Sequence, residues 1–507
     1  MTTVHWPILR TMARRALKTA VIDDQRAWKN IEILVAAMHL AGEIERRSQS
    51  RTIATLLPTS GLFPIAALAG WMLGRVVVPL NYILSHAEID WITRHCETDA
   101  VVTVGPILDH LKYTPTVHAI RLEEMSFKGV PEPRIPASAM ADDLAALLYT
   151  SGTSGRPKGV ELTHGNLREN VRQIDEWVDF GANDRMLGAL PQFHSFGFTV
   201  LTLLPMTIGI PVVYTARFVP TQIVRLLREH RPTFFVALPS MYNALATVKS
   251  ATADDFASLR YIVSGGEPLP ESVFQLYQER FNKTINEGYG LTETAPVTNW
   301  CRPHEFRRRS VGKALPRVTV DVVDLETGRE LPPGRAGEVR IGGPNVSRGY
   351  FKNPEASRAM RDEKGRLRTG DIGRLDADGH LYITGRHKEM LIIAGENVFP
   401  REIEEVLNQH PSVRASGVVG EMDDHRGEVA VAAVEMIDDL PFDEAELRRW
   451  VRERIGAART PRKIAVMSEL PKGPTGKVLR REIKRMLDAG ELFPDEPAAE
   501  ARSTAGA

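Results

Sequence analysis

Short apolar runs rich in β-branched residues alternate with amphipathic, helix-patterned segments along most of this chain, and that alternation limits the folds open to it. Strand-like runs occur at 210–214, 233–238 and 261–266, and the segment 220–230 between them has apolar residues at helical spacing. Such a series is typical of βαβ units, in which helices cover both faces of a parallel sheet. We therefore expect an α/β fold built on parallel sheets.

Two changes in the sequence pattern farther along the chain predict a small subdomain and a separate C-terminal domain. From about residue 318 the strands become shorter and the turns Gly-rich, as in "GEVRIGG" and "GHLYITG", which indicates a small β-rich subdomain over about 318–387. Beyond it, two capped amphipathic helices with strands between them predict an α+β lid domain. We expect a large domain over 1–387, a mobile lid over 388–490 and a disordered tail over 491–507.

The stretch between Arg51 and Arg75 carries no charge, which satisfies a crude length test for a membrane span. Prolines and glycines interrupt it, so we interpret it as a buried strand, a turn and a packed helix, followed by a strand at 76–80. The first twenty residues lack the apolar core of a secretory signal. They predict a solvated first helix, with a peripheral membrane contact as the alternative.

The overall charge gives no reason to expect a highly charged partner. Lys and Arg number 64, as do Asp and Glu, and the sequence pI is about 7.3, so no global field would attract nucleic acid. A small-molecule enzyme is favoured. The two cysteines, Cys96 and Cys301, have neither CxxC nor zinc-site spacing, which predicts no disulfide framework and a reducing, cytoplasmic setting.

The segment "YTSGTSGRPKGVELTHGN" (149–166) resembles a phosphate-binding loop but is not a Walker A motif, because Gly159 rather than Ser or Thr follows Lys158. Both flanks are strand-like, so we expect a hairpin loop, with a helix beginning at Asn166. Its backbone N–H groups, its hydroxyls and Lys158 could hold a polyphosphate. By composition alone, a flexible linker is the alternative.

Six further motifs follow this loop, and their order identifies a family. In chain order, all seven are "YTSGTSGRPKG" (149–159), "PQFHSFG" (191–197), "GGEPLP" (265–270), "GYGLTET" (288–294), "RTGD" (368–371), "GRHKEMLIIAGENVFPREIE" (385–404) and "PKGPTGKVLRREI" (471–483). Together they resemble the acyl-adenylate-forming superfamily, which includes acyl-CoA synthetases, adenylation domains of peptide synthetases and beetle luciferases. The resemblance covers nearly the whole chain. It implies that ATP is cleaved at the α-phosphate and that pyrophosphate is released.

The resemblance also implies roles for individual residues. The β- and γ-phosphates would be bound by Thr150, Ser151, Gly152, Thr153, Ser154, Gly155 and Lys158. Adenine would lie against Gly288, Tyr289 and Gly290 on one side and against Gly265, Gly266 and Glu267 on the other. Thr292 would contact the α-phosphate, and Glu293, with Thr150, would hold Mg²⁺. Asp371 would bind the ribose hydroxyls, and Arg386 would contact ribose or phosphate.

Three residues of the expected lid domain would serve the two half-reactions. Lys477, in the Gly/Pro-flanked turn "KGPTGK", would bridge the substrate carboxylate and the α-phosphate. Lys388 matches the family's hinge, about which the lid would rotate between the half-reactions. Gly395 would line a tunnel for pantetheine, because only hydrogen fits where a thin ligand passes the backbone closely.

The substrate is predicted from "PQFHSFGF", which places His194 among aromatic residues where amino-acid-activating relatives carry an Asp. With Phe193, Phe196, Phe198 and "LTLLPM", it favours a pocket for an acyl tail and resembles fatty-acid-activating members. We expect a medium- or long-chain acid, ATP, Mg²⁺ and coenzyme A. The alternatives are acyl carrier protein phosphopantetheine as acceptor, an aromatic or short branched acid, and a non-catalytic nucleotide- and acyl-binding module. Either a monomer or a homodimer is consistent with the sequence.

Overall fold

The computed structural model describes residues 3–150, 156–393, 396–423, 427–437, 440–457, 459–472 and 478–493. The chain forms two compact units. The first comprises Met1–Leu269, Leu276–Thr369 and Leu375–Tyr382, and the second comprises Pro270–Gln275, Gly370–Arg374 and Ile383–Ala507. The lid boundary expected at Lys388 stays a prediction, and the expected tail from residue 494 onward lies outside the described residues.

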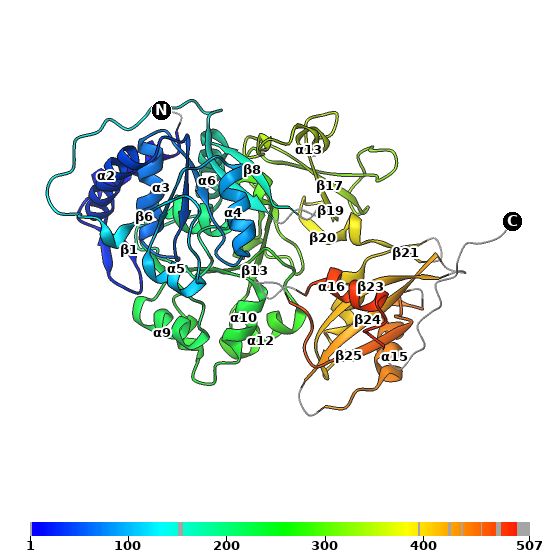
Figure 1. The fold of residues 1–507 in the computed structure, drawn as a ribbon. Coiled ribbons are helices and arrows are strands. Elements are labelled where there is room, and N and C mark those ends of the chain that lie inside the picture. The colour runs from blue at the N-terminus through cyan, green and yellow to red at the C-terminus, as the bar shows by residue number, and fades with distance from the viewer. Residues whose placement is uncertain are drawn as a thin grey trace. The chain divides into compact units, whose positions relative to one another are not determined.

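Two large, mainly parallel sheets form the first unit, which confirms the α/β prediction (Figure 1). The nine-stranded sheet has the order β15-β14-β13-β12-β11-β9-β10-β1-β2, and the strands from β1 to β13 along it pair in parallel. Its strands are β1 (Thr19–Ile22), β2 (Ala27–Lys29), β9 (Met186–Gly188), β10 (Val212–Tyr214), β11 (Phe234–Ala237), β12 (Tyr261–Ser264), β13 (Asn286–Gly290), β14 (Val297–Trp300) and β15 (Lys313–Ala314).

The seven-stranded sheet has the order β18-β8-β7-β4-β3-β5-β6. Its strands are β3 (Thr52–Leu56), β4 (Val76–Pro79), β5 (Ala100–Thr103), β6 (His118–Arg121), β7 (Leu144–Thr150), β8 (Lys158–Thr163) and β18 (Gly349–Tyr350). The pairs β7–β8 and β8–β18 are antiparallel and the others are parallel. This antiparallel edge therefore carries the predicted phosphate loop between β7 and β8.

Helices connect the strands of both sheets, and α2 and α3 lie side by side (Figure 1). The helices are α1 (His5–Arg14), α2 (Asn30–Arg47), α3 (Leu62–Met72), α4 (His86–His95), α5 (Gly105–Leu111), α6 (His164–Trp177), α7 (Ser195–Phe198), α8 (Leu204–Ile208), α9 (Pro220–His230), α10 (Pro239–Ala246), α11 (Ala253–Phe256), α12 (Glu271–Phe281) and α13 (Pro354–Ala359), with a π-helix, η2, at Thr199–Leu203. This alternation of short apolar strands with helices is what the sequence predicted.

The uncharged stretch folds as expected into β3, α3 and β4, and almost every residue of α3 is buried. Among the described residues, no helix combines the length and apolarity needed to cross a membrane. The prediction of a solvated first helix is wrong for one face of α1, because Ile8 and Met12 are fully buried there. The helix α6 begins at His164, two residues earlier than expected, since the Thr163 hydroxyl caps it by accepting from the Asn166 N–H.

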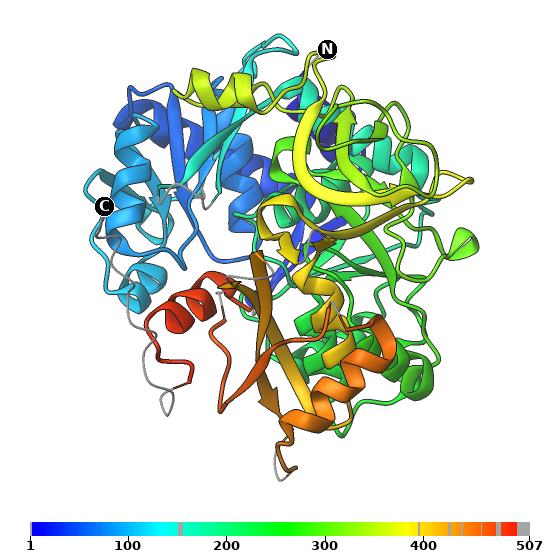
Figure 2. The same ribbon diagram turned by 90° about the vertical axis from the view of Figure 1, so that its right-hand side faces the viewer.

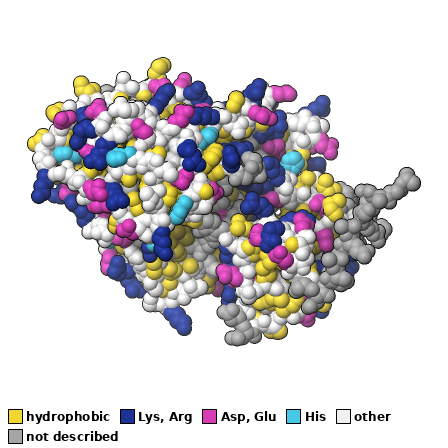
Figure 3. Space-filling view, in the orientation of Figure 1, with side chains coloured by type: hydrophobic (Ala, Val, Ile, Leu, Met, Phe, Trp, Pro, Cys, Tyr) yellow, Lys and Arg dark blue, Asp and Glu magenta, His cyan; other side chains and the backbone are white. Residues whose placement is uncertain are grey.

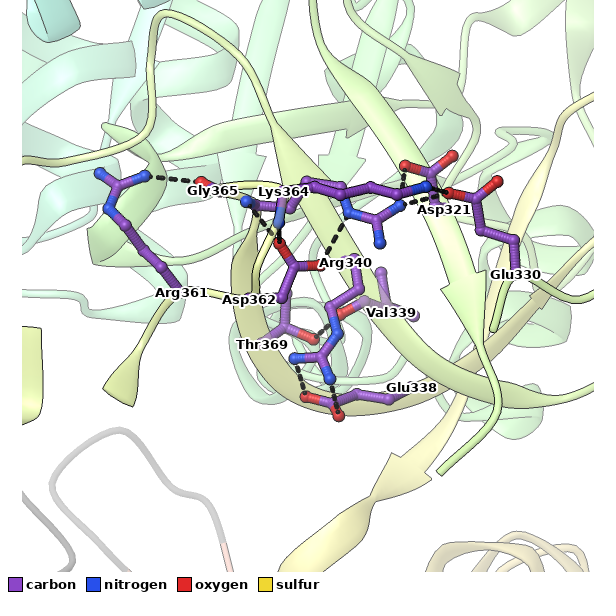
Figure 4. A network of polar contacts seen from close by, with 11 residues as sticks. Asp321, Glu330, Glu338, Val339, Arg340, Arg361, Asp362, Lys364, Gly365 and Thr369 are labelled. Atoms are coloured by element: carbon purple, nitrogen blue, oxygen red, sulfur yellow. Dashed lines mark hydrogen bonds and ion pairs between the residues drawn. The ribbon is translucent and has the colours of Figure 1, made fainter. Parts of the chain in front are cut away.

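The expected β-rich subdomain is a four-stranded sheet with the order β16-β17-β19-β20. Its strands are β16 (Thr319–Val323), β17 (Gly337–Gly342), β19 (Leu367–Leu375) and β20 (Leu381–Arg386). Just before β19, the guanidinium of Arg366 lies 2.8 Å from each of the carboxylates of Asp321, Glu330 and Asp362 (Figure 4). This network fixes the start of β19, the strand that carries the "RTGD" motif.

The second unit is built on a sheet with helices on both faces. Its elements are β21 (Leu391–Ile393), β22 (Glu396–Val398), β23 (Val413–Asp423), β24 (Gly427–Met436), β25 (Lys463–Met467), α14 (Pro400–Leu407), α15 (Glu444–Ile455) and α16 (Arg480–Asp488). Ala430 and Ala432 of β24 pack with α14 and α15, whereas Val431 packs with α16. Because neighbouring strand residues face opposite sides, α15 and α16 cover opposite faces (Figure 2).

Both cysteines are buried and unpaired, as the sequence predicted. On the face drawn in Figure 3, basic and acidic side chains are interspersed, in keeping with the equal numbers of the two kinds. This face therefore offers no broad field of one sign.

Candidate active site

The parallel pairing of β12 with β13 brings together the two motifs predicted to flank adenine. Ser264, the last residue of β12, is in register with Glu287, so the glycines after β12 lie beside the first glycine of "GYG". A Cβ added to Gly265 would be 3.5 Å from the Gly288 carbonyl oxygen and 2.9 Å from a ring carbon of Phe196. Gly265 is therefore required by this close approach, and "GGE", "GYG" and "PQFHSFG" converge at one edge of the sheet.

Tyr289 is half-buried in β13 opposite Asn299, and its carbonyl accepts from the Thr298 hydroxyl at 3.1 Å. Gly290 is also sterically required, since an added Cβ would lie 1.9 Å from the Pro296 carbonyl oxygen. Gly266 has a φ of +79°, in the left-handed region that favours glycine. The adenine contacts assigned to Tyr289, Gly266 and Glu267 stay predictions, but the backbone at these positions is tightly constrained.

Thr292 and Glu293 lie in a short 3₁₀ turn, η3 (Thr292–Thr294), directly after β13. The Thr292 hydroxyl oxygen is 3.2 Å from that of Ser195, which joins "LTET" to "PQFHSFG" by a second contact. The Glu293 carboxylate accepts a hydrogen bond of 2.7 Å from the Tyr350 hydroxyl. Both predicted residues therefore lie in the part of the first unit that also holds His194, which directly precedes the Ser195 that contacts Thr292.

Tyr350 is a site residue that the sequence reasoning missed. Burial, and secondarily the Glu293 carboxylate, raise the pKa of Tyr350, so its hydroxyl stays protonated and donates to Glu293. The Lys158 Nζ lies 5.2 Å from the centroid of the Tyr350 ring, within cation–π range. One aromatic ring thus links the predicted phosphate-binding lysine to the predicted magnesium-binding carboxylate. No local signal reveals this, because Tyr350 follows Glu293 by 57 residues.

The strands flanking the predicted phosphate loop form the hairpin that the sequence indicated. Thr150, at the end of β7, is in register with Lys158, at the start of β8. The Phe351 N–H donates to the Gly159 carbonyl at 2.8 Å, which holds the β18 segment, with Tyr350, against β8. The residues Ser151, Gly152, Thr153, Ser154 and Gly155 lie outside the described part of the chain.

His194 precedes α7, where its Nδ1 accepts from the Phe196 N–H at 3.4 Å. The side chain keeps exposed surface, yet desolvation by the surrounding protein lowers its pKa. The lowered pKa favours the neutral ring near pH 7. The role of His194 at the acyl site stays a prediction, and a neutral ring is the form expected for it.

The aromatic residues around His194 differ in their burial. Phe193 is half-buried and packs edge-on to Tyr82, with ring centroids 4.8 Å apart. Phe198 is fully buried and packs edge-on to Phe63 and Trp71, at 5.9 and 6.1 Å. The residues of "LTLLPM" are likewise buried. The prediction that Phe198 and this stretch line an acyl pocket is therefore corrected, because they fill the core between helices.

In the second unit, the two residues predicted to bind ribose form an ion pair. The Arg386 Nε lies 2.9 Å from the Asp371 carboxylate, which is 3% exposed, whereas Arg386 is exposed. The pairing follows from their places on the strands β19 and β20. Lys388, the predicted hinge, is exposed in the 3₁₀ turn η5 (His387–Glu389). Lys477 and Gly395 lie outside the described residues.

A cavity of about 480 Å³ opens elsewhere in the first unit. It is lined by the end of β1, the end of β10 and α9, including Asp24, Arg217 and His230. None of its lining residues belongs to the seven motifs. The chemistry of the motifs, rather than this cavity, therefore locates the candidate active site.

Comparison with known proteins identifies the family. Residues 9–351 match the family model of AMP-binding enzymes, and residues 402–477 match that of the AMP-binding enzyme C-terminal domain. A feruloyl-CoA synthase of Amycolatopsis is 32% identical over 499 residues, covering 95% of this chain and 98% of the relative. A long-chain-fatty-acid–CoA ligase of Bacillus subtilis is 34% identical over 357 residues, covering 69% of this chain and 63% of the relative.

A solved structure supports the same assignment. The o-succinylbenzoate CoA synthetase of Bacillus subtilis, in complex with an acyl-adenylate intermediate, is similar with a TM-score of 0.84 and 28% sequence identity, covering 94% of this chain and 97% of the other. The fold, the motif order and the matched models agree. The chain belongs to the AMP-binding enzyme family, that of AMP-forming acid–thiol ligases.

Proposed function

We propose that this enzyme forms an acyl-adenylate from ATP and an apolar carboxylic acid, releases pyrophosphate, and transfers the acyl group to coenzyme A with release of AMP. The observation that carries the proposal is the grouping of Lys158, Tyr350 and Glu293 in the first unit. A lysine offers a positive charge to phosphate oxygens, and a carboxylate offers the hard oxygen ligand that Mg²⁺ prefers. With Mg²⁺ bound, the metal would neutralise charge that develops on the phosphates.

The contacts of these residues support a separate role for each side chain of the site. Tyr350 would orient the Glu293 carboxylate, Lys158 would bind the outer phosphates, and Thr292 would donate to the α-phosphate from a position set by Ser195. Asp371 would accept from the ribose hydroxyls, with Arg386 beside it. Lys477 would offset the repulsion between the substrate carboxylate and the α-phosphate, as the family resemblance implies.

Two classes of acid are candidates. The sequence favours a medium- or long-chain fatty acid, and the similarity to a long-chain-fatty-acid–CoA ligase supports it. An aromatic acid is the second candidate, because the Tyr82–Phe193 pair offers ring faces and edges next to His194, and a feruloyl-CoA synthase is similar over almost the whole chain. Because Phe198 and the residues of "LTLLPM" are buried in the core, they give less support for a long acyl tail than the sequence suggested.

Acid-dependent pyrophosphate release tests the proposal and separates the two classes. The purified enzyme would receive ATP, Mg²⁺ and either decanoate, a hydroxycinnamic acid or phenylalanine as an α-amino acid. We expect at least one apolar acid to react about 10-fold faster than phenylalanine, since a pocket without an acidic partner leaves the ammonium group unpaired. Faster turnover with the amino acid would refute the substrate class.

A variant of the aromatic pair distinguishes the two candidates further. Phe193→Leu should lower kcat/KM for the hydroxycinnamic acid about 3- to 10-fold more than for decanoate, because ring-ring contact is lost while apolar area remains. Phe127→Leu, a change at an exposed ring, is the matched control. Equal losses for both acids would exclude stacking on Phe193.

The thiol acceptor needs a separate experiment. Offering coenzyme A and acyl carrier protein in parallel decides which thiol accepts the acyl group.

A further inference from the structure

The turn between β19 and β20 brings together three side chains that no part of the acyl-adenylate chemistry uses. Asp376, Asp378 and His380 each offer a metal-ligating atom, and these atoms all lie within 4.8 Å of one another. All three residues belong to the first unit. An acidic turn of this kind is common without an ion, so the case for a site depends on the histidine.

The environment of His380 leaves one of its ring nitrogens facing a carboxylate. The residue is 3% exposed, and its Nε2 lies 3.3 Å from the Glu305 carbonyl oxygen. A carbonyl only accepts, so the Nε2 that faces Glu305 carries a proton, and Nδ1 is the ring nitrogen left for another partner. Within the described chain, the buried Nδ1 has no hydrogen-bond partner, and it lies 3.6 Å from an Asp376 carboxylate oxygen. A buried ring nitrogen that has no hydrogen-bond partner and lies beside carboxylates is an available ligand for a cation.

The distance between His380 Nδ1 and the Asp376 carboxylate suits a transition-metal ion between them. With ligand bonds of about 2.0–2.2 Å, two ligands at a tetrahedral angle lie about 3.3–3.6 Å apart. Histidines that bind metals typically donate their other N–H to a carbonyl or a carboxylate, as His380 does to Glu305. The Asp376 carboxylate is itself oriented by the N–H groups of Asp378 and His380, at 3.0 and 2.9 Å, and by the Tyr382 hydroxyl at 3.2 Å.

We propose that Asp376, Asp378 and His380 form a binding site for a divalent transition-metal ion such as Zn²⁺, with one nitrogen and two carboxylate ligands and water in the remaining positions. Asp378 is exposed and pairs with Arg307 at 3.2 Å, so it can turn to the ion at small cost. The neighbouring Leu381 exchanges backbone hydrogen bonds with Val311 and Gly312. An ion at this turn would therefore fasten it to the segment 305–312.

The test uses the full chain without a histidine tag, stripped of metal and free of ATP. Calorimetry with Zn²⁺ and visible absorption with Co²⁺ should show one ion per chain at this site. His380→Phe and Asp378→Asn should each weaken Zn²⁺ binding by at least about 10-fold. Asp324→Asn is the matched control, because Asp324 accepts from the N–H groups of Glu326 and Thr327 in a similar turn that lacks a histidine. It should leave the affinity unchanged.

Two results would overturn the proposal. The first is equal Zn²⁺ stoichiometry and affinity in the parent chain and His380→Phe, which would place any bound ion elsewhere. The second comes from nitrogen-15 NMR of the histidine rings: if His380 carries a proton on Nδ1 at pH 7 and its signals do not respond to Zn²⁺, a proton supplies the positive charge instead. Both measurements are independent of acid activation.

Discussion

At the scale of the residue, Tyr350 orients the Glu293 carboxylate in the candidate active site. Its hydroxyl donates to Glu293 at 2.7 Å, and a hydrogen bond to a charged group contributes about 1.5–3 kcal/mol. Tyr350→Phe should therefore raise the Mg²⁺ concentration needed for half-maximal pyrophosphate release by about 10-fold, because the carboxylate loses its orientation. Tyr113→Phe is the matched control, since Tyr113 donates to Asp90 at 2.6 Å outside the motifs. An unchanged Mg²⁺ requirement would remove Tyr350 from the site.

Asp371 allows a second prediction at this scale. Its buried carboxylate pairs with Arg386, and we expect it to accept from the ribose hydroxyls. Asp371→Asn should weaken AMP binding in calorimetry by about 10-fold or more and raise the KM for ATP, because a charged acceptor is lost. Asp362→Asn lies in the Arg366 network on the same sheet and serves as the structural control. If both variants bind AMP equally well, Asp371 supports only the fold.

At the scale of the element, the docking of α1 depends on two neutral histidines. The Val4 N–H donates to the His164 Nδ1 at 3.2 Å, and the His5 ring lies edge-on to His164 at 5.8 Å, with its Nε2 3.1 Å from the Ala137 carbonyl. Burial lowers the pKa of each histidine to about 4, despite the backbone contact at His5 and Asp143 near His164. Protonation would remove the acceptor at His164 and place two positive charges together.

The sign of the pH effect follows from these lowered pKa values. The neutral rings stabilise the docked helix fully above about pH 6.5, and this stability falls as the pH drops toward 4, by up to about 1.4 kcal/mol per pH unit for each histidine. Hydrogen exchange of residues 3–14 should therefore speed up between pH 6.5 and 4.5, after correction for intrinsic rates. His5→Phe should flatten this dependence, whereas the exposed His110→Gln should not. A pH-independent exchange rate in the parent chain would contradict the prediction.

At the scale of the whole molecule, the two half-reactions should respond to different variants. Lys477→Ala should slow adenylation by about 10²-fold or more, the scale of losing one preorganised electrostatic group, and leave thioester formation from synthetic acyl-adenylate close to the parent rate. Lys388→Pro should show the reverse order, because a fixed φ in the exposed turn η5 hinders a rotation needed for the second step. Equal slowing of both steps by either variant would contradict a rotating lid.

Local pattern in the sequence determined the elements and the family of this protein. The alternation of strand and helix periods predicted the parallel sheets, and the uncharged stretch was correctly interpreted as β3, α3 and β4, because periodicity and turn residues act within a few positions of one another. The order of the seven motifs indicated the family, and the family resemblance implied the chemistry. The strands around Lys158 formed the expected hairpin.

Only the tertiary structure decided which distant residues meet. It placed Tyr350 between Lys158 and Glu293 and buried Phe198 in the core, although the nearby Phe193 and Phe196 are only partly buried. It also set His380 against Asp376, close to the Glu305 carbonyl. The physical reason is that strand pairing and side-chain packing join segments many residues apart, and local hydrophobic periodicity does not encode which partner lies opposite. The sequence could therefore propose candidate site residues, whereas their contacts with distant side chains became evident only from the fold.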